Sequence, residues 1–198
     1  MIQEPLLMQS QSGAFNCDTI IQHEVSKLCD RYKLKNAIEL GCCIGYTAAW
    51  LAAQFEQVRT VEINENFLNI AKINRLNALP NVTTYLGDSI TKLAEMLEGW
   101  GDDTFIFVDS HWGEITPAPQ ELDIIATHGI KPVIAVHDFQ VPNHPELGYD
   151  CYDGDKPFNF TWLKPNLDKI YGEGGYNHYY NDEAEGAMRG MLYVVPLK

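Results

Sequence analysis

Five short apolar segments alternate with segments of helical spacing in this chain, and that alternation limits the fold more than any other feature. Runs rich in β-branched and aromatic residues are typical of buried strands. Strands that alternate with helices pair in parallel through right-handed crossovers. The five expected strands are residues 36–40, 58–63, 82–86, 104–108 and 132–136. The sequence therefore predicts an α/β fold, a Rossmann-like doubly wound sheet with helices on both faces.

The rest of the chain is assigned from periodicity and from helix stop signals. Helices are expected at 16–32, 46–54, 65–79, 90–97, 116–128 and 158–170. Pro80 should end the third of these, and Pro165 should kink or split the last. Residues 141–157 are expected to form a long loop. The segments 176–180 and 191–195 should form an antiparallel hairpin that closes an otherwise mostly parallel sheet.

The chain has 198 residues, which suits one domain. We divide that domain into an N-terminal helical segment (1–35), a cofactor-binding core (36–140) and a substrate-side part (141–198). The sequence contains no apolar run long enough to span a membrane and no secretory signal pattern, so we expect a cytoplasmic protein without a membrane partner. Whether it is a monomer or a homodimer stays open.

The chain is strongly acidic, with a formal net charge of −13. Such a surface repels a polyphosphate backbone, so we expect no nucleic-acid partner and a small-molecule substrate instead. The charge also serves plain solubility. The five cysteines are odd in number and lack metal-binding spacing, which is typical of reduced thiols.

The first candidate site is the turn after the first strand, which contains Gly41 and Gly45. Glycines let a ligand approach the backbone closely, and the helix N-terminus that follows offers unpaired N–H groups. The dinucleotide pattern G-x-G-x-x-G is absent. Glu39 would repel a diphosphate but favour a ligand with an ammonium group. An ordinary tight turn is the alternative.

Acidic residues follow the second and third strands. Glu62 lies about twenty positions after the glycine turn, where a carboxylate can accept hydrogen bonds from ribose hydroxyls. Asp88 could accept a hydrogen bond from an adenine amino group while Ser89 caps the next helix. Alone, either signal is weak, because charged residues at strand ends are often only solvated.

Asp109 and Asp138 follow the fourth and fifth strands, each beside a histidine. Two carboxylates that converge on one crevice could bind a hard divalent cation, which would lower the pKa of a substrate hydroxyl. His111 and His137 could instead act as general bases. A third interpretation is that both aspartates only cap helices or line the cofactor pocket.

These motifs, in this order, resemble those of the class I S-adenosylmethionine-dependent methyltransferases. The similarity is greatest to the small cation-dependent O-methyltransferases of the catechol type. It rests on the segments ELGCCIGYTAAWLA, RTVEINENFLNIAK, GDSI and FVDSHW, and covers about residues 36–140.

The resemblance implies a binding role for a set of residues at the ends of the first four strands. Those that would hold S-adenosylmethionine are Glu39, Gly41, Gly45, Tyr46, Thr47, Glu62, Asp88, Ser89, Asp109 and Trp112. The resemblance also puts His111 and Trp112 against the adenine ring and makes Asp109 and Asp138 ligands of a cation such as Mg²⁺. From the residues themselves, the candidate catalytic groups are Asp109, His111 and His137. The reaction implied is O-methylation of a small hydroxylated molecule.

Two positions depart from the family pattern. Phe139 stands where the family commonly has Asn, and Gly113 stands where the catechol enzymes have Lys. A cofactor-binding module without turnover therefore remains an alternative. A nicotinamide-dependent oxidoreductase is another, although it would need a tighter glycine-rich turn. The aromatic side chains of residues 141–198 could line a pocket for the methyl acceptor, or they could only pack in the core and on the surface.

Overall fold

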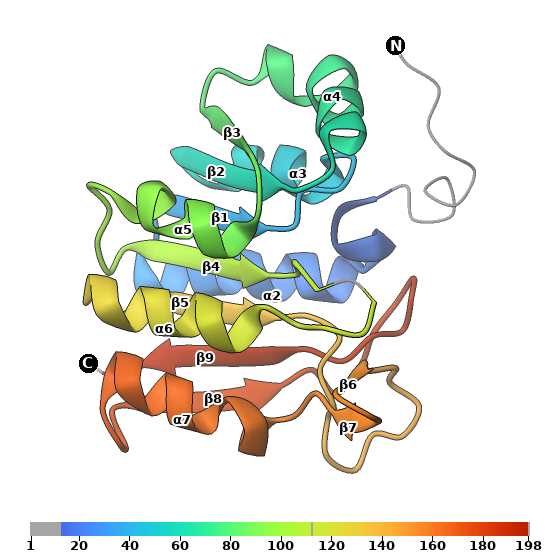
Figure 1. Cartoon of the computed structure of the whole chain (residues 1–198), viewed down its shortest axis with the longest axis vertical. Helices are drawn as coiled ribbons and strands as arrows, with labels where there is room; N and C mark the ends of the chain where they lie inside the picture. Colours follow the sequence, from blue (N-terminus) through green and yellow to red (C-terminus); the bar gives the residue numbers. More distant parts are fainter. Residues whose placement is uncertain (1–12, 112, 198) are drawn as a thin grey trace.

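The computed structural model describes residues 13–111 and 113–197. One seven-stranded sheet runs through it in the order β3-β2-β1-β4-β5-β9-β8 (Figure 1). Its strands are β1 (Asn36–Leu40), β2 (Gln57–Glu62), β3 (Val82–Leu86), β4 (Thr104–Val108), β5 (Val133–Val136), β8 (Tyr176–Tyr180) and β9 (Leu192–Pro196). The first five strands pair in parallel, and β9 lies antiparallel between β5 and β8. The predicted doubly wound sheet and its C-terminal antiparallel hairpin are confirmed.

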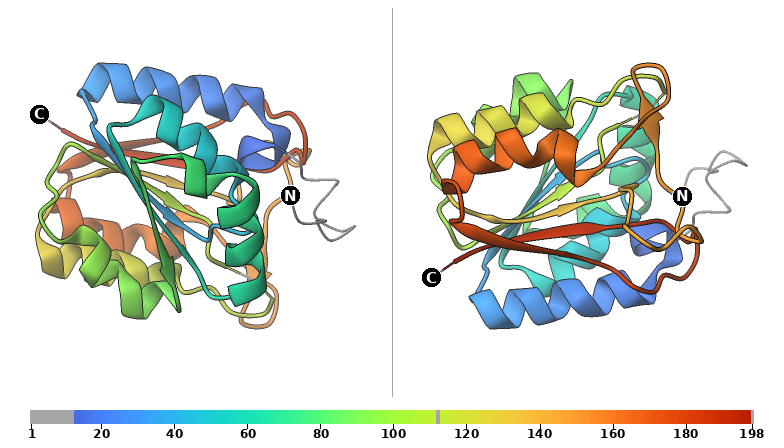
Figure 2. Two further views of the ribbon diagram at one scale, coloured as in Figure 1. Left: turned by 90° about the horizontal axis from the view of Figure 1, so that it is seen from above. Right: turned by 90° about the horizontal axis from the view of Figure 1, so that it is seen from below.

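The helices form a layer on each face of the sheet. They are α2 (Thr19–Tyr32), α3 (Tyr46–Gln54), α4 (Glu65–Asn74), α5 (Ser89–Leu97), α6 (Ala118–His128) and α7 (Phe160–Tyr171). Figure 2 shows α2, α3 and α4 on one face and α5, α6 and α7 on the other. None of the helices in the described ranges is long and apolar enough to cross a membrane.

Strand β4 shows why the two layers form. Phe105 and Phe107 point to the core beneath α2 and α3, whereas Ile106 and Val108 point to the core beneath α5, α6 and α7. Every residue of β4 is buried. A strand buried on both faces is a continuous apolar run, as the sequence indicated.

Several details differ from the sequence prediction. In place of a helix over 16–32, a 3-10 turn, Ala14–Cys17, precedes α2, which begins at Thr19. Helix α4 ends at Asn74, and a separate 3-10 turn, Leu76–Ala78, precedes Pro80. Helix α7 continues through Pro165 without a split. Packing holds it, because Asn166 in its next turn donates hydrogen bonds to the carbonyl of Pro119 and to Asp123. The expected loop 141–157 contains a two-stranded hairpin of β6 (Cys151–Tyr152) and β7 (Lys156–Pro157).

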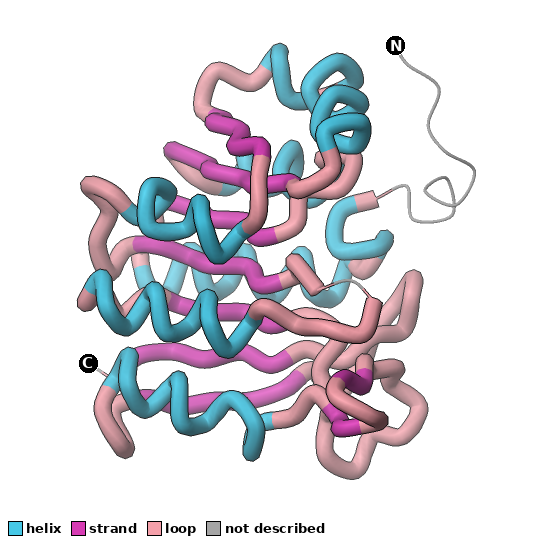
Figure 3. Tube along the Cα trace, viewed as in Figure 1, coloured by secondary structure: helices cyan, strands magenta, loops and turns pink. Residues whose placement is uncertain are grey.

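The carboxyl ends of the parallel strands lie together on the right-hand edge in Figure 1. The loops after β1, β4 and β5 meet there, next to the β6–β7 hairpin and the short 3-10 turn Ala14–Cys17, as the tube in Figure 3 also shows. Strand order reverses between β1 and β4, which are neighbours. In open α/β sheets, ligands bind at the carboxyl ends of the strands beside such a reversal.

Candidate active site

The turn after β1 forms one wall of a pocket at the strand reversal. Gly41 has a φ of +100°, and a Cβ placed on it would lie 2.2 Å from the backbone carbonyl oxygen of Asp109. Glycine is therefore required where this turn passes the end of β4. The pocket is lined by the turn residues 41–47 together with Gly13, Asn16, Glu39 and Asp109. Five of the positions that the resemblance implied for cofactor binding line it: Glu39, Gly41, Gly45, Tyr46 and Thr47.

Glu39 is buried at the base of this pocket, with 1% of its surface exposed. Its carboxylate accepts a hydrogen bond from the Thr60 hydroxyl on the neighbouring strand. Burial raises the pKa of Glu39 well above its usual value, although the hydrogen bonds from Thr60 and from the Ala48 backbone oppose that effect. A positive group in the pocket would favour the ionised carboxylate.

Glu62 ends β2 and faces the same turn. One carboxylate oxygen accepts a hydrogen bond from the Cys43 backbone N–H at 2.7 Å, and the other accepts one from the Asn64 N–H at 2.8 Å. Burial raises the pKa of this carboxyl. Each oxygen keeps a second lone pair, so both can still accept a hydroxyl donor.

The sequence prediction for Asp88 and Ser89 needs a correction. Asp88, not Ser89, caps α5, because its carboxylate accepts a hydrogen bond from the Ile90 N–H at 2.8 Å. Ser89 is the first residue of the helix and is buried. The aspartate prevails because its side chain already satisfies the open N–H group of the first turn. Asp88 is exposed, and it is not one of the residues that line the pocket beside Gly41.

The sequence did not reveal Glu121, a fully buried carboxyl on α6. Ser110 donates a hydrogen bond to its Oε1 atom at 2.5 Å, and this contact ties the loop after β4 to the helix. Its Oε2 atom has no hydrogen-bond partner among the described residues. Burial raises the pKa of Glu121. An acid in the first turn of a helix usually complements the helix dipole, so the pattern carried no sign of burial.

A second feature that sequence reasoning missed is the cover over the pocket. The turn Ala14–Cys17 lies against the start of α3, where the Phe15 N–H donates to the Thr47 hydroxyl at 2.9 Å. Phe15 and Asn16 both have positive φ angles, which are uncommon for residues other than glycine. The connection between β8 and β9 holds this turn from outside, since a Cβ on Gly186 would lie 2.1 Å from the Asn16 carbonyl oxygen.

Next to the pocket, four side chains form what we call the His–Asp cluster: Asp109, His111, His137 and Asp138. Their ligand-type atoms all lie within 4.8 Å of one another. The Nε2 atom of His111 lies 2.9 Å from Asp138 Oδ2 and 3.7 Å from Asp109 Oδ1. The Nδ1 atom of His137 lies 3.2 Å from each of the same two oxygens. Asp109 therefore belongs to both the pocket and the cluster.

The backbone and a distant arginine set the orientation of Asp138. This residue has a φ of 55°, in the left-handed region. Arg189, from the β8–β9 connection, donates to Asp138 Oδ1 and to Asp150 Oδ1. Asp150 in turn accepts a hydrogen bond from Tyr152 at 3.0 Å. Because Arg189 occupies Oδ1, Asp138 presents Oδ2 to the two histidines.

The charges of the cluster shift its proton affinities. Burial alone would lower the pKa of His137, but Asp109 and Asp138 outweigh it and place that pKa well above the usual value. The pKa of His111 is raised in the same way, against the effect of burial. Burial would raise the pKa of Asp138, yet the two histidines hold it far below its usual range. In the absence of another cation, the cluster therefore favours imidazolium and carboxylate ions.

The remaining positions are placed as follows. Phe139, where the resembling family commonly has Asn, is fully buried and packs edge-on against Phe158 with ring centroids 5.1 Å apart. It offers no ligand to the cluster. Tyr152, from the tail, packs edge-on against His111 at 5.9 Å and lies in the core. Trp112, expected against the adenine ring, lies outside the described residues.

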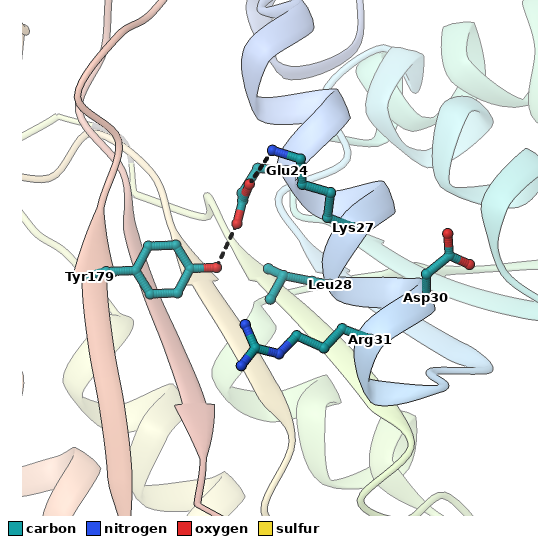
Figure 4. A pocket seen from close by; sticks show the side chains of 6 residues that line it. All are labelled: Glu24, Lys27, Leu28, Asp30, Arg31 and Tyr179. Atoms are coloured by element: carbon teal, nitrogen blue, oxygen red, sulfur yellow. Dashed lines mark hydrogen bonds and ion pairs between the residues drawn. The ribbon is translucent and has the colours of Figure 1, made fainter.

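A separate hollow lies between α2 and β8, lined by Glu24, Lys27, Leu28, Asp30, Arg31 and Tyr179 (Figure 4). Tyr179 donates a hydrogen bond to Glu24 at 2.7 Å, and Lys27 pairs with the same carboxylate at 3.3 Å. None of the residues implied by the sequence motifs lines this hollow.

No protein-family model matches the chain, and no curated protein matches it in sequence. Solved structures match it closely in fold. An O-methyltransferase from Bacillus cereus, in complex with S-adenosylhomocysteine, is 21% identical with a TM-score of 0.64, over 90% of this chain and 81% of that one. The O-methyltransferase TomG of tomaymycin synthesis from Streptomyces achromogenes, in complex with S-adenosylmethionine, is 15% identical with a TM-score of 0.64, over 100% and 92% of the two chains.

This chain has the methyltransferase fold. The amino pentose methyltransferase CalS10 from Micromonospora echinaspora also shares it, at 15% identity and a TM-score of 0.57, over 99% of this chain and all of that one. The methyltransferase fold differs from the dinucleotide-binding fold, whose sixth strand continues the parallel order, because here β9 lies antiparallel between β5 and β8. The predicted fold class is thus confirmed.

Proposed function

We propose that this protein is an S-adenosylmethionine-dependent methyltransferase that methylates a hydroxyl group of a small molecule. The observation that carries the proposal is the pocket lined by Glu39 and Asp109 beside Gly41, a position with no space for a side chain. S-adenosylmethionine and its product occupy two of the solved structures with this fold. The acidic surface and the small size of the chain favour a small-molecule acceptor in the cytoplasm.

The residues implied for cofactor binding have separate tasks in this proposal. Glu39 and the N–H groups at Tyr46 and Thr47 would hold the methionine part, with Gly45 leading into that helix. Glu62 would accept the ribose hydroxyls. Asp88 would lie at the adenine edge, and buried Ser89 would support the floor below it rather than contact the base.

The cofactor would supply an electrophilic methyl group, and the protein must align the acceptor oxygen with it and remove the hydroxyl proton. The His–Asp cluster adjoins the pocket through Asp109, and in this proposal it would hold that hydroxyl. Its imidazoles have raised pKa values and could take the proton only after losing their own, whereas a divalent cation bound by the cluster would lower the pKa of the hydroxyl. The donor set fits a cation, because two carboxylates and two imidazoles converge within 4.8 Å.

The experiment has two parts on the same purified protein. Calorimetric titration with S-adenosylmethionine tests the pocket, and a screen with radiolabelled cofactor over phenols, sugars and carboxylates tests methyl transfer. We expect binding and transfer to at least one hydroxylated class. Binding without transfer to any acceptor would favour a module that has lost turnover, and an absence of binding would refute the proposal.

A further inference from the structure

We infer that the His–Asp cluster is a mixed nitrogen and oxygen site for one transition-metal ion, with His111 and His137 as ligands rather than as general bases. It would bind Zn²⁺ or Fe²⁺ in preference to Mg²⁺. The inference deepens the proposed function, since the ion would lie beside the acceptor, but binding of the ion can be measured without a cofactor or an acceptor.

The first argument is the unsatisfied nitrogen of His137. This side chain is 1% exposed, and its Nδ1 atom lies 3.2 Å from Asp109 Oδ1 and from Asp138 Oδ2. Both contacts are ion pairs, and within the described residues this buried atom makes no hydrogen bond. Buried polar atoms nearly always have such a bond or a metal as partner. An ion bound between the histidine and the two carboxylates would give the nitrogen that partner.

The second argument is the spacing of the four donor atoms. A tetrahedral ion that holds its ligands at about 2.0–2.1 Å keeps neighbouring ligand atoms about 3.3 Å apart. The four separations between a nitrogen and an oxygen donor are 2.9, 3.2, 3.2 and 3.7 Å, and all donor atoms lie within 4.8 Å of one another. The nitrogen–oxygen separations lie on both sides of about 3.3 Å, so an ion would bind after the side chains adjust.

The third argument is the chemistry of the donors. Imidazole suits Zn²⁺, Fe²⁺ and similar ions, whereas Mg²⁺ prefers oxygen ligands and retains several waters. Half of the donors here are imidazole nitrogens. The side chain after Asp138 is the buried Phe139, which supplies no oxygen. The set is therefore a poor match to Mg²⁺ and a good one to a borderline ion.

The fourth argument is the support around the ligands. Arg189 holds Oδ1 of Asp138 and Oδ1 of Asp150, which leaves Asp138 Oδ2 for the cluster. Contacts of this kind orient metal ligands from outside. Arg189 is thus a positioning residue for the ion site.

The test uses the full chain after treatment with a chelator. Calorimetry with Zn²⁺, and separately with Mg²⁺, should show one Zn²⁺ per chain, bound at least about 100-fold more tightly than Mg²⁺. Co²⁺ should give the visible absorption bands of a four- or five-coordinate nitrogen and oxygen site. Mg²⁺ binding as tight as Zn²⁺ binding, or no Zn²⁺ binding at millimolar concentration, would overturn the inference.

Variants identify the ligands. His137→Phe should weaken Zn²⁺ binding about 100-fold or more and remove the Co²⁺ bands. His144→Phe is the matched control, because His144 lies on a loop outside the cluster, where it pairs with Glu146. Circular dichroism checks that both variants fold. If His137→Phe does not fold, the Co²⁺ spectrum of the unaltered protein still tests whether nitrogen ligands hold the ion. Unchanged Zn²⁺ affinity in a folded His137→Phe protein would exclude this histidine as a ligand. S-adenosylmethionine titration of the same samples separates this outcome from failure of the proposed function.

Discussion

A Cβ on Gly41 would lie 2.2 Å from the carbonyl oxygen of Asp109, so the turn after β1 and the His–Asp cluster are in contact through their backbones. The contact joins the loop after β1 to the loop after β4, at the point where the strand order reverses. The position of Asp109 therefore depends on the absence of a side chain at Gly41. The two halves of the proposed site are one structural unit.

Substitution of Gly41 tests this unit. Gly41→Ala should destabilise the fold by about 1–3 kcal/mol, because alanine is strained at a φ of +100° and its Cβ meets backbone. It should also weaken S-adenosylmethionine binding at least about 10-fold, since the turn must move away from Asp109. Urea unfolding and calorimetry measure the two effects. Gly174→Ala is the control, because its φ is +71° but open space surrounds its Cβ position. Equal cofactor affinity in the two variants would contradict the proposed contact.

Proton release tests the role of Glu39. Burial raises the pKa of this carboxyl well above its usual value before any ligand binds. An ammonium or sulfonium group nearby favours the ionised form and lowers that pKa, so binding should release a proton at mildly acidic pH. The affinity should therefore rise with pH until the pH exceeds the pKa of the cofactor-free protein. Calorimetry in two buffers of different ionisation enthalpy detects the release.

The matched variant for this prediction is Glu39→Gln. It keeps the shape of the side chain and should abolish the release while weakening binding by about 10–100-fold, the range for a hydrogen bond to a charged group. Identical binding heats in both buffers for the unaltered protein would mean that the positive group of the cofactor does not bind next to Glu39.

Glu62 gives a third prediction. Glu62→Ala should weaken cofactor binding by about 1–3 kcal/mol, because ribose hydroxyls would lose their acceptor. The carboxylate also accepts hydrogen bonds from Cys43 and Asn64, so the melting temperature should fall as well. Glu65→Ala, one turn further on an exposed position, serves as the control for both measurements. Unchanged affinity in Glu62→Ala would count against the ribose assignment.

The sequence predicted the strands well because most of them are short runs of apolar and β-branched residues. Strands β1, β3, β4 and β8 have the bounds expected from their residues. Burial on both faces makes β4 apolar from Phe105 to Val108, and the turn residues that follow β1 mark its end. These signals are local, and local patterns are what a sequence displays directly.

The parts of the site that the sequence did not predict come from distant contacts. Arg189 and Asp138 are 51 positions apart in the sequence, and no local pattern of residues predicts that they pair. The turn that contains Phe15 takes positive φ angles that its residue types do not favour. The sequence named both histidines of the cluster, but only the fold brings His111 and His137 to the same two carboxylates.

Gly186 connects the pocket cover to the rest of the site, and this connection gives a fourth prediction. A Cβ at this position would lie 2.1 Å from the Asn16 carbonyl oxygen, so Gly186→Ala should push the Ala14–Cys17 turn away from the pocket. We expect faster cofactor dissociation, with a total loss of affinity of about 10-fold, since the cover restricts exit. Stopped-flow release of a fluorescent cofactor analogue measures the rate. Gly174→Ala should leave that rate unchanged. An equal effect of both substitutions would mean that the Ala14–Cys17 turn does not control release of the cofactor.

Glu121 gives a fifth prediction, on stability and pH. Burial raises the pKa of Glu121 above its unfolded value, so its contribution to stability is present below a pH of about 4.5 and is lost as the pH rises through the folded pKa. Glu121→Gln cannot ionise and should avoid that loss, while its side-chain oxygen still accepts the hydrogen bond from Ser110. The variant should melt above the unaltered protein at pH 8 and approach it near pH 4.5. A gap of a few degrees is expected, because about 1 kcal/mol shifts the melting temperature of a chain this size by roughly 2–4 °C.

Glu56→Gln is the control for this prediction. It lies at an exposed position and should have the melting temperature of the unaltered protein at every pH. A gap that stays constant or shrinks as the pH rises would mean that Glu121 is ionised in the fold and is stabilised by a group other than Ser110.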